Sequence, residues 1–315
     1  MLRLFAHANY KFIEIRRIAY AISIATVVIS LGAFVFFQVA KGSWANYGVD
    51  FAGGTLLQVR FTQPTSVGQL RGVLAPQFPG TEITRFGGEN EFLIRAAHFS
   101  EGDANVSDLM AGTLRQEYGE KFSVVRTEAV GPKVGGELQQ KALIAILLSF
   151  AATLIYLAFR FEWRFGLAAI ITTAHDIIVT LGVISLFRLE VSLTTVAAVL
   201  TIVGYSLNDT IIIFDRIREN LKKLGRKVDL IHAMDRSINE TLPRTTLTVT
   251  TTLATLASLA ILGGSTIRGF AVIMFFGIAL GTYSSIFVAS PVLYEIERRW
   301  GEQPGSKPAR QRAAM

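Results

Sequence analysis

The chain has 315 residues, of which 51% are hydrophobic and 17% are charged, and its formal net charge is +7. A soluble protein usually carries about 25% charged residues, so the composition excludes an ordinary soluble domain and an intrinsically disordered chain. The sequence contains no cysteine, which excludes a disulfide scaffold, a cysteine-ligated metal site and a thiol nucleophile.

Six apolar segments are each about long enough to cross a bilayer, which takes about 20 residues. They cover residues 18–40, 142–159, 165–187, 191–214, 245–267 and 269–292. The sequence therefore predicts a membrane α-helical bundle of six transmembrane helices, ending near residue 295. The first segment follows a basic N-terminus but is longer than the apolar region of a usual signal peptide, so we expect an uncleaved anchor.

Basic residues are distributed unevenly around these segments. One set of loops, together with both chain ends, holds nineteen Lys and Arg residues, whereas the short loops on the opposite side hold only Arg188 and Arg268. Positive charge gathers in cytoplasmic loops. We therefore predict cytoplasmic segments at 1–17, 215–244 and 296–315, the last of them a disordered tail, with both termini cytoplasmic. The net charge then reflects membrane topology and indicates no nucleic-acid partner.

The segment 41–141, between the first two spans, is nearly neutral and is predicted to be an exported domain. Alternating apolar residues predict strands at 55–61, 82–86, 92–97 and 122–130, and helical spacing predicts helices at 67–78 and 106–118. The order β-α-β-β-α-β is that of a ferredoxin-like α+β domain. Its sequence contains no motif for a metal cluster, a phosphate loop or a catalytic constellation.

Ionisable residues inside the spans require a reason, because an ionised side chain there costs about 2.5–3.5 kcal/mol on insertion scales. Asp209 lies near the cytoplasmic end of the fourth span, with Asn208 beside it on a polar helix face. The fifth span opens with Arg244 and continues with several threonines, Thr248 among them. Asp176 lies at the middle of the third span and follows His175.

Two interpretations of these residues remain open. In the first, Asp209 changes its contact with Arg244 between two conformations and so binds and releases protons near neutral pH. In the second, the polar groups only hydrogen-bond helices together. Asp176 is a weaker candidate for the same relay, and His175 fits a packing role. The spacing of Gly277 and Gly281 indicates close helix packing, and residues 215–220 read as a charged helix surface that faces water or lipid headgroups.

Several motifs taken together resemble one family between about residues 10 and 297. They are GVDFAGGT at 48–55, VGP at 130–132, GEL at 136–138, FEWR at 161–164, HD at 175–176, SLNDT at 206–210, DRIREN at 215–220, PRTTLT at 243–248 and GTYSS at 281–285. This set resembles the SecF members of the SecD/SecF family of protein-export membrane proteins, which are related to the proton-driven RND superfamily.

The resemblance implies an accessory role in the Sec pathway of the bacterial cytoplasmic (inner) membrane. The partners it implies are SecD, the SecYEG translocon, YajC, a translocating unfolded polypeptide and the lipid bilayer. The proton-motive force would drive late steps of translocation, with protons as the coupling ion and no cofactor. The family's intramembrane aspartate and arginine correspond to Asp209 and Arg244. Asp176, His175, Asn208 and Thr248 are secondary relay or packing candidates, and the motif residues Asp50, Gly53 and Gly54 fit a structural role. Pro243 is expected near the first turn of the fifth span.

The chain is not expected to be an enzyme, because its sequence contains no nucleotide loop, catalytic triad or metal cluster. Two alternatives to the export subunit remain. One is an RND-type proton-coupled transporter of small solutes, although the chain has one modest exported domain where two large ones are usual. The other is a scaffold of the translocation channel whose buried charges only hold helices together.

Overall fold

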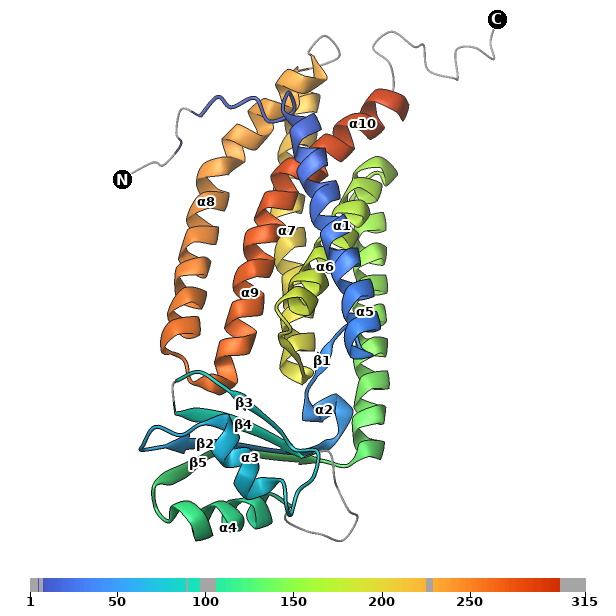
Figure 1. The fold of residues 1–315 in the computed structure, drawn as a ribbon. Coiled ribbons are helices and arrows are strands. Elements are labelled where there is room, and N and C mark those ends of the chain that lie inside the picture. The colour runs from blue at the N-terminus through green and yellow to red at the C-terminus, as the bar shows by residue number, and fades with distance from the viewer. Residues whose placement is uncertain (1–4, 6–7, 89, 97–105, 225–228, 301–315) are drawn as a thin grey trace, which may run out of the picture.

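The computed structural model describes residues 5, 8–88, 90–96, 106–224 and 229–300. Within these residues six helical rods are long and apolar enough to cross a bilayer. They are α1 (Arg16–Lys41), α5 (Pro132–Arg160), α6 (Trp163–Leu186), α7 (Leu193–Leu224), α8 (Leu230–Leu262) and a rod formed by α9 (Ser265–Ser284), the π-helical segment η1 (Ser285–Ala289) and α10 (Ser290–Trp300). The rods form one bundle, so the fold is that of a multi-pass helical membrane protein (Figure 1).

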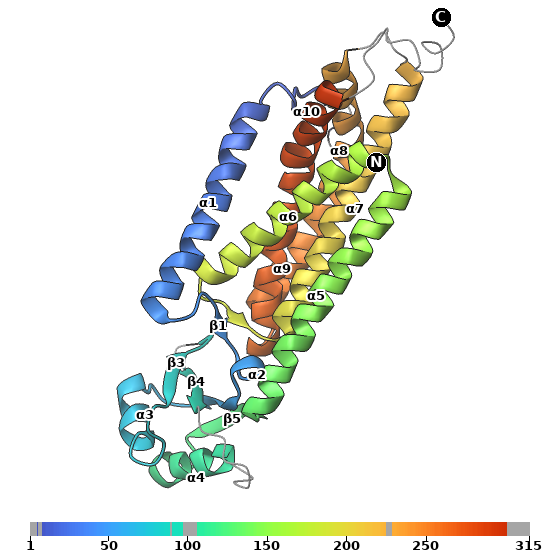
Figure 2. The ribbon, with the colours of Figure 1, turned by 90° about the vertical axis from the view of Figure 1, so that its right-hand side faces the viewer.

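The centre of the bundle consists of α6, α7 and the α9–α10 rod, whereas α5 is exposed along most of its length. α6 crosses the bundle obliquely from the end of α5 to the far end of α1 (Figure 2). Small residues permit the closest approaches, as is typical of membrane helices. A Cβ atom on Gly281 of α9 would lie 2.9 Å from the Cβ of Ser206 on α7, and one on Gly277 would overlap Ile202. The predicted packing role of this glycine pair is confirmed.

A four-stranded sheet with two helices forms a separate layer at one end of the bundle. Its elements are β2 (Gly54–Phe61), α3 (Val67–Leu74), β3 (Glu82–Arg85), β4 (Glu91–Ala96), α4 (Val106–Tyr118) and β5 (Phe122–Val130). The strand order is β3-β4-β2-β5, and all neighbouring strands are antiparallel. The order of strands and helices along the chain agrees with the prediction.

Both helices of this domain cover the sheet face that points away from the bundle (Figure 1). Between them and the sheet lies an apolar core that includes Phe61, Leu70, Phe92 and Leu114. The start of α3 is fixed by a capping box, in which Ser66 and Gln69 satisfy each other's backbone N–H groups. The sheet domain therefore has a core of its own and sits opposite the bundle end at which α1 begins and α10 ends.

The helices differ from the predicted apolar spans in three ways. α5 begins at Pro132, before the predicted span, because its polar first turns continue the same helix toward the sheet domain. Most of the segment 215–244 is helical, since α7 continues to Leu224 and α8 starts at Leu230. The sixth span contains the π-helical segment η1, which no apolar pattern reveals. The disordered tail was predicted to begin at residue 296, but residues 296–300 belong to α10, and the rest of that tail, residues 301–315, lies outside the described residues.

Pro243 also differs from its prediction. It lies in the interior of α8, three turns from the start of the helix, and not in its first turn. Proline lacks a backbone N–H, so the carbonyl oxygen of Asn239 loses its helical donor. α8 therefore contains one weak turn between its polar first part and its apolar second part.

Candidate functional site

Asp209 lies on α7 at the side that faces α8. Its residue is only 2% exposed, although the neighbouring Asn208 is exposed. One turn earlier, the hydroxyl group of Tyr205 lies 2.9 Å from the hydroxyl group of Thr252 on α8. Tyr205 and Asp209 thus form a polar stripe along the α7–α8 contact.

Arg244 interacts electrostatically with the Asp209 carboxylate. Its own residue is exposed, and no hydrogen bond or ion pair joins these two described residues. Buried Thr245 follows Arg244, and its hydroxyl group has no hydrogen-bond partner among the described residues. The site therefore brings Asp209 and Arg244 into electrostatic range without pairing them, and their role as a relay stays a prediction.

Asp176 occupies a more complete site at the junction of three helices. The residue is 1% exposed. Its Oδ1 atom lies 2.9 Å from Nδ1 of His175, and its Oδ2 atom accepts hydrogen bonds from Ser206 of α7 at 2.5 Å and from Ser284 of α9 at 2.7 Å. The carboxylate therefore joins α6, α7 and α9, which is the pattern expected for a buried acidic group whose acceptors are satisfied.

The other polar side-chain atoms around this site differ in whether they have a hydrogen-bond partner. Nε2 of His175 is buried and has no hydrogen-bond partner among the described residues. Ser285, the first residue of η1, donates to the carbonyl oxygen of Gly281 and lies 2.9 Å from the hydroxyl group of Thr210. π-Helical segments are rare and are frequently found at functional sites. The polar contact of Thr210 on α7 with the α9–α10 rod therefore lies at the first residue of η1.

Hydroxyl groups line the exposed side of α8. Each donates to a backbone carbonyl oxygen one turn earlier in its own helix, as Thr248 does to Arg244 at 3.0 Å. The exposed residues that behave in this way are Thr248, Thr251, Thr255 and Ser258. Thr248 is therefore not a ligand of Asp209 in this structure, and the face it occupies is left without a covering helix from the described part of the chain.

The motif at 48–55 forms the junction between the sheet domain and the bundle. β1 (Asn46–Tyr47) pairs in parallel with β6 (Glu190–Val191), the strand that precedes α7. Asp50, on the short helix α2 (Val49–Ala52), accepts a hydrogen bond at 2.9 Å from the backbone N–H of Leu193, the first residue of α7. Asp50 therefore caps α7 from a distant segment of the chain.

The two consecutive glycines of this motif have positive φ angles, +71° at Gly53 and +106° at Gly54, which glycine adopts at little cost. The backbone of α5 also passes close by. A Cβ atom on Gly135 would lie 3.0 Å from the carbonyl oxygen of Phe51 and 3.1 Å from the amide nitrogen of Gly53. The φ angles favour glycine at positions 53 and 54, and the short distances leave no room for a side chain at position 135, where α5 meets the sheet domain.

Removing the Asp50 carboxylate is expected to loosen the start of α7. The Asp50→Ala variant should lower the stability of this helix end by about 1 kcal/mol, the usual value of a helix cap. Hydrogen–deuterium exchange of peptides covering the first turns of α7 measures the effect. Glu117→Ala, which removes an exposed carboxylate from α4, is the control, and equal exchange in both variants would contradict the capping role.

The sequence did not predict the two serines that donate hydrogen bonds to Asp176. It also missed the ion pair of 2.7 Å between Arg95 of β4 and Glu190 of β6, which ties the sheet to the loop before α7. A signal was present for the serines, because Ser206 and Ser284 lie in the motifs at 206–210 and 281–285. No local pattern indicates that Arg95 and Glu190 meet.

These features define a class: a six-helix membrane protein with acidic groups buried in its bundle and an α+β domain anchored at one end. A family model described as protein export membrane protein SecD/SecF, C-terminal, matches residues 110–299, and one described as the SecD/SecF GG motif matches residues 45–65. The chain therefore belongs to the SecD/SecF family.

Individual relatives agree with this assignment. The chain is 47% identical to the protein translocase subunit SecF of Gemmatimonas aurantiaca over 95% of this chain and 91% of the relative. Identity to the subunit SecF of Rickettsia conorii is 42% over 90% of this chain and 91% of the relative.

Two solved structures are similar as well. The crystal structure of SecDF from Thermus thermophilus, a translocon-associated membrane protein, matches with a TM-score of 0.82 and 38% identity, over 95% of this chain and 40% of that chain. SecDF in a super-membrane-facing form matches with a TM-score of 0.67 and 36% identity, over 100% of this chain and 41% of that chain. The chain thus spans about two fifths of the length of these solved proteins.

Proposed function

We propose that the chain, an accessory subunit of the Sec protein-export machinery, acts with SecD to use the proton-motive force in late steps of polypeptide translocation. The observation that carries the proposal is the burial of Asp209 beside α8, with Arg244 in electrostatic range but unpaired. An ionised carboxylate is costly at this depth and needs a cation. A protonated carboxyl group does not need one.

This difference gives the relay a physical basis. Proton binding to Asp209 removes its charge and with it the attraction to Arg244, so the two protonation states favour different positions of α8 relative to α7. Proton entry from one side of the membrane and release on the other would then drive a cycle between these positions. Asn208 and Thr248 border this route as secondary candidates, while Asp176 and His175 lie on a separate contact within the bundle.

SecD is the partner that the proposal requires. The hydroxyl groups on α8 form an exposed polar face, and membrane helix contacts are enriched in such residues. We infer that SecD covers this face and completes the proton route. SecYEG, YajC and the translocating unfolded polypeptide are further proposed partners, and nucleic acid is not among them.

The proposed location is the bacterial cytoplasmic membrane, with residues 1–17 and 296–315 in the cytoplasm and 41–141 outside it. The distribution of basic residues supports this orientation, and so does the position of the sheet domain at the end of the bundle opposite the start of α1. We further propose that the sheet domain is ferredoxin-like, on the strength of its strand order. The proposal assigns the chain no enzymatic reaction and no cofactor, and the coupling ion is the proton.

The Asp209→Asn variant tests the proposal. Export of a secreted precursor is measured in inverted membrane vesicles with the proton-motive force present and then collapsed. The part of the export rate that depends on this force should fall by about tenfold or more, a conservative value for the loss of a proton-transfer group. The part that persists without the force should stay unchanged.

Asp215→Asn is the matched control, because it makes the same replacement on the same helix at a partly exposed carboxylate that pairs with Arg160. The abundance of the chain and of SecD is measured in every sample. Export by Asp209→Asn at the wild-type rate would overturn the relay and leave the scaffold interpretation. A defect in solute efflux without an export defect would favour the small-solute transporter.

A further inference from the structure

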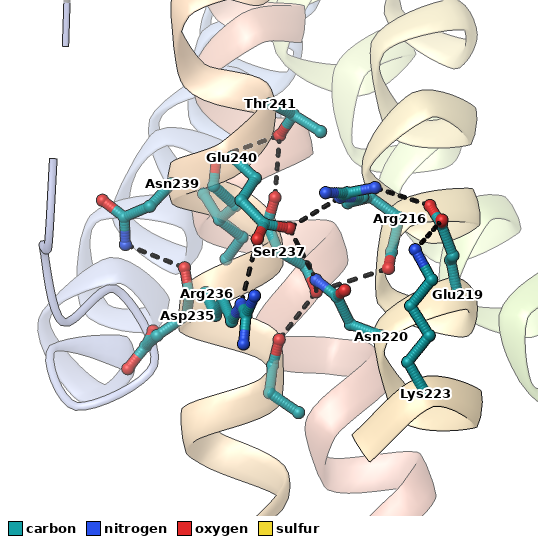
Figure 3. Close-up of polar contacts among 12 residues, drawn as sticks. Arg216, Glu219, Asn220, Lys223, Asp235, Arg236, Ser237, Asn239, Glu240 and Thr241 are labelled. Atoms are coloured by element: carbon teal, nitrogen blue, oxygen red, sulfur yellow. Dashed lines mark hydrogen bonds and ion pairs between the residues drawn. The ribbon is translucent and has the colours of Figure 1, made fainter. Parts of the chain in front are cut away.

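The cytoplasmic ends of α7 and α8 are joined by a network of polar side chains (Figure 3). Sequence reasoning interpreted residues 215–220 as a surface that faces water or lipid headgroups. The structure contradicts this interpretation for Asn220, which is buried against α8, whereas Arg216 contacts α8 and stays partly exposed. Asn220 is only 3% exposed. The motif therefore belongs to a helix–helix contact.

Glu240 of α8 is the centre of this network. Its Oε2 atom accepts hydrogen bonds from Nε of Arg216 at 2.6 Å and from Nδ2 of Asn220 at 2.8 Å, both from α7. Its Oε1 atom accepts one from Nε of Arg236 at 2.9 Å, within α8. One carboxylate thus receives three donors, two of which bridge the helices, and charge-assisted bonds of this kind are stronger than neutral ones.

A second bond reinforces the bridge from the interior side. Nδ2 of Asn220 also donates to the hydroxyl group of Ser237 at 3.0 Å, and Ser237 is fully buried. Because both partners are buried, this contact is less exposed to competition from water than a surface ion pair. The bridge therefore fixes how far α8 can slide along α7.

The opposite side of α8 is held by the segment that precedes α1. Asn239 exchanges two hydrogen bonds with the backbone of Tyr10, at 2.9 and 2.8 Å, and Asp235 accepts one from the backbone N–H of Ile13 at 2.8 Å. α8 is consequently held on two sides at its cytoplasmic end, immediately before the turn that Pro243 weakens.

The position of this network along both helices gives it a consequence for Asp209 and Arg244. Arg244 follows Glu240 by one helical turn, and Asp209 precedes Arg216 by about two turns. On the far side, the contact between Tyr205 and Thr252 joins the same two helices. The two charged residues therefore lie between two polar bridges, and only the cytoplasmic bridge contains ion pairs.

We propose that Glu240, with its α7 donors Arg216 and Asn220, forms a set of positioning residues that fixes the register between α7 and α8 and so sets the separation of Asp209 and Arg244. This inference rests on the proposed function. It assigns the network a task in proton coupling that differs from general stabilisation of the fold.

The first test measures the register directly. The chain has no cysteine, so cysteines introduced at exposed Thr201 of α7 and exposed Thr255 of α8 carry a spin-label pair, and electron spin resonance gives their distance. The distance distribution should shift or broaden in Arg216→Gln and Glu240→Gln. It should stay unchanged in Arg236→Gln, the matched control, which removes a charged donor to Glu240 without breaking a bridge. Distance distributions that equal the wild-type distribution in all three variants would overturn the proposal.

The second test separates positioning from general stability. Arg216→Gln and Glu240→Gln should each reduce the force-dependent part of export by about fivefold, the effect of a modest displacement of reacting groups, while Arg236→Gln has no such effect. Combined with Asp209→Asn, they should cause no further loss, because the network acts through Asp209. A purely structural role would instead lower export in the Asp209→Asn background as well, together with abundance.

The outcomes also distinguish this inference from the proposed function. If Asp209→Asn is defective and the two bridge variants resemble Arg236→Gln, the positioning role is wrong and the relay stands. If Asp209→Asn exports like wild type, the relay is wrong, and the positioning role falls with it even where the distance changes.

Discussion

Replacing Asp176 by alanine is expected to lower the free energy of unfolding by about 2–6 kcal/mol. The substitution removes the shared acceptor of His175, Ser206 and Ser284. Each buried donor left without a partner costs about 1–3 kcal/mol. Ser284 retains the carbonyl oxygen of Gly281 as an acceptor at 3.0 Å, so two donors lose their partners and not three. Unfolding in mixed micelles with increasing amounts of SDS measures the loss.

The Asp176→Asn variant is the control for this prediction. Its amide oxygen still accepts hydrogen bonds from both serines, so it should lose only about 1 kcal/mol, the net value of an ordinary hydrogen bond. Equal stability of the alanine variant and the wild type would contradict a bonded carboxylate at this three-helix junction. A larger loss in asparagine than in alanine would also contradict it.

Replacing Phe92 by alanine should cost the sheet domain about 3–5 kcal/mol, the usual range for removing a fully buried aromatic side chain. Phe92 is 0% exposed, and its ring meets that of Phe61 edge to face at 5.8 Å between centroids. The cavity lies between the sheet and its two helices, where few side chains can move to fill it. Hydrogen–deuterium exchange of peptides from β2 and β4 should accelerate by orders of magnitude, while exchange in the bundle stays slow.

Val125→Ala serves as the comparison, because Val125 is exposed on β5 of the same sheet. It should change exchange in β2 and β4 very little. If both variants exchange equally fast, the core of the sheet domain is not where the structure places it. Faster exchange throughout the bundle in Phe92→Ala would show that the domain and the bundle unfold as one unit.

The six spans and the elements of the sheet domain were accessible from the sequence because apolar periodicity reports local burial. The β4 strand is an example, since its residues are apolar wherever they face the helices. The boundaries of α7 and α8 were not accessible in this way. The ends of both helices near residues 215–244 are rich in charged residues, and hydropathy did not reveal that Arg216 and Asn220 of α7 contact Glu240 of α8 there.

The candidate site was predicted in its residue types but not in its contacts. Asp176 and Asp209 stood out because charged residues are rare in membrane spans. The sequence could not reveal that Asp176, the weaker candidate, has partners on three helices, whereas no hydrogen bond joins Asp209 to Arg244 in the described part of the chain. Contacts between distant segments depend on packing angles, which hydropathy does not report. For the same reason the π-helical segment η1 and the Arg95–Glu190 ion pair were not foreseen.

One helix connects the two ends of the molecule. α7 has 32 residues, which gives it a length of about 48 Å. The bridge to Glu240 holds its C-terminal end, Asp209 lies near its middle, and Asp50 and β6 attach its N-terminal end to the sheet domain. A small tilt of such a helix at one end produces a larger displacement at the other end. If α7 pivots about the bridge to Glu240, a tilt of only about 10° carries its far end through roughly 6 Å, and the sheet domain would be carried along with it.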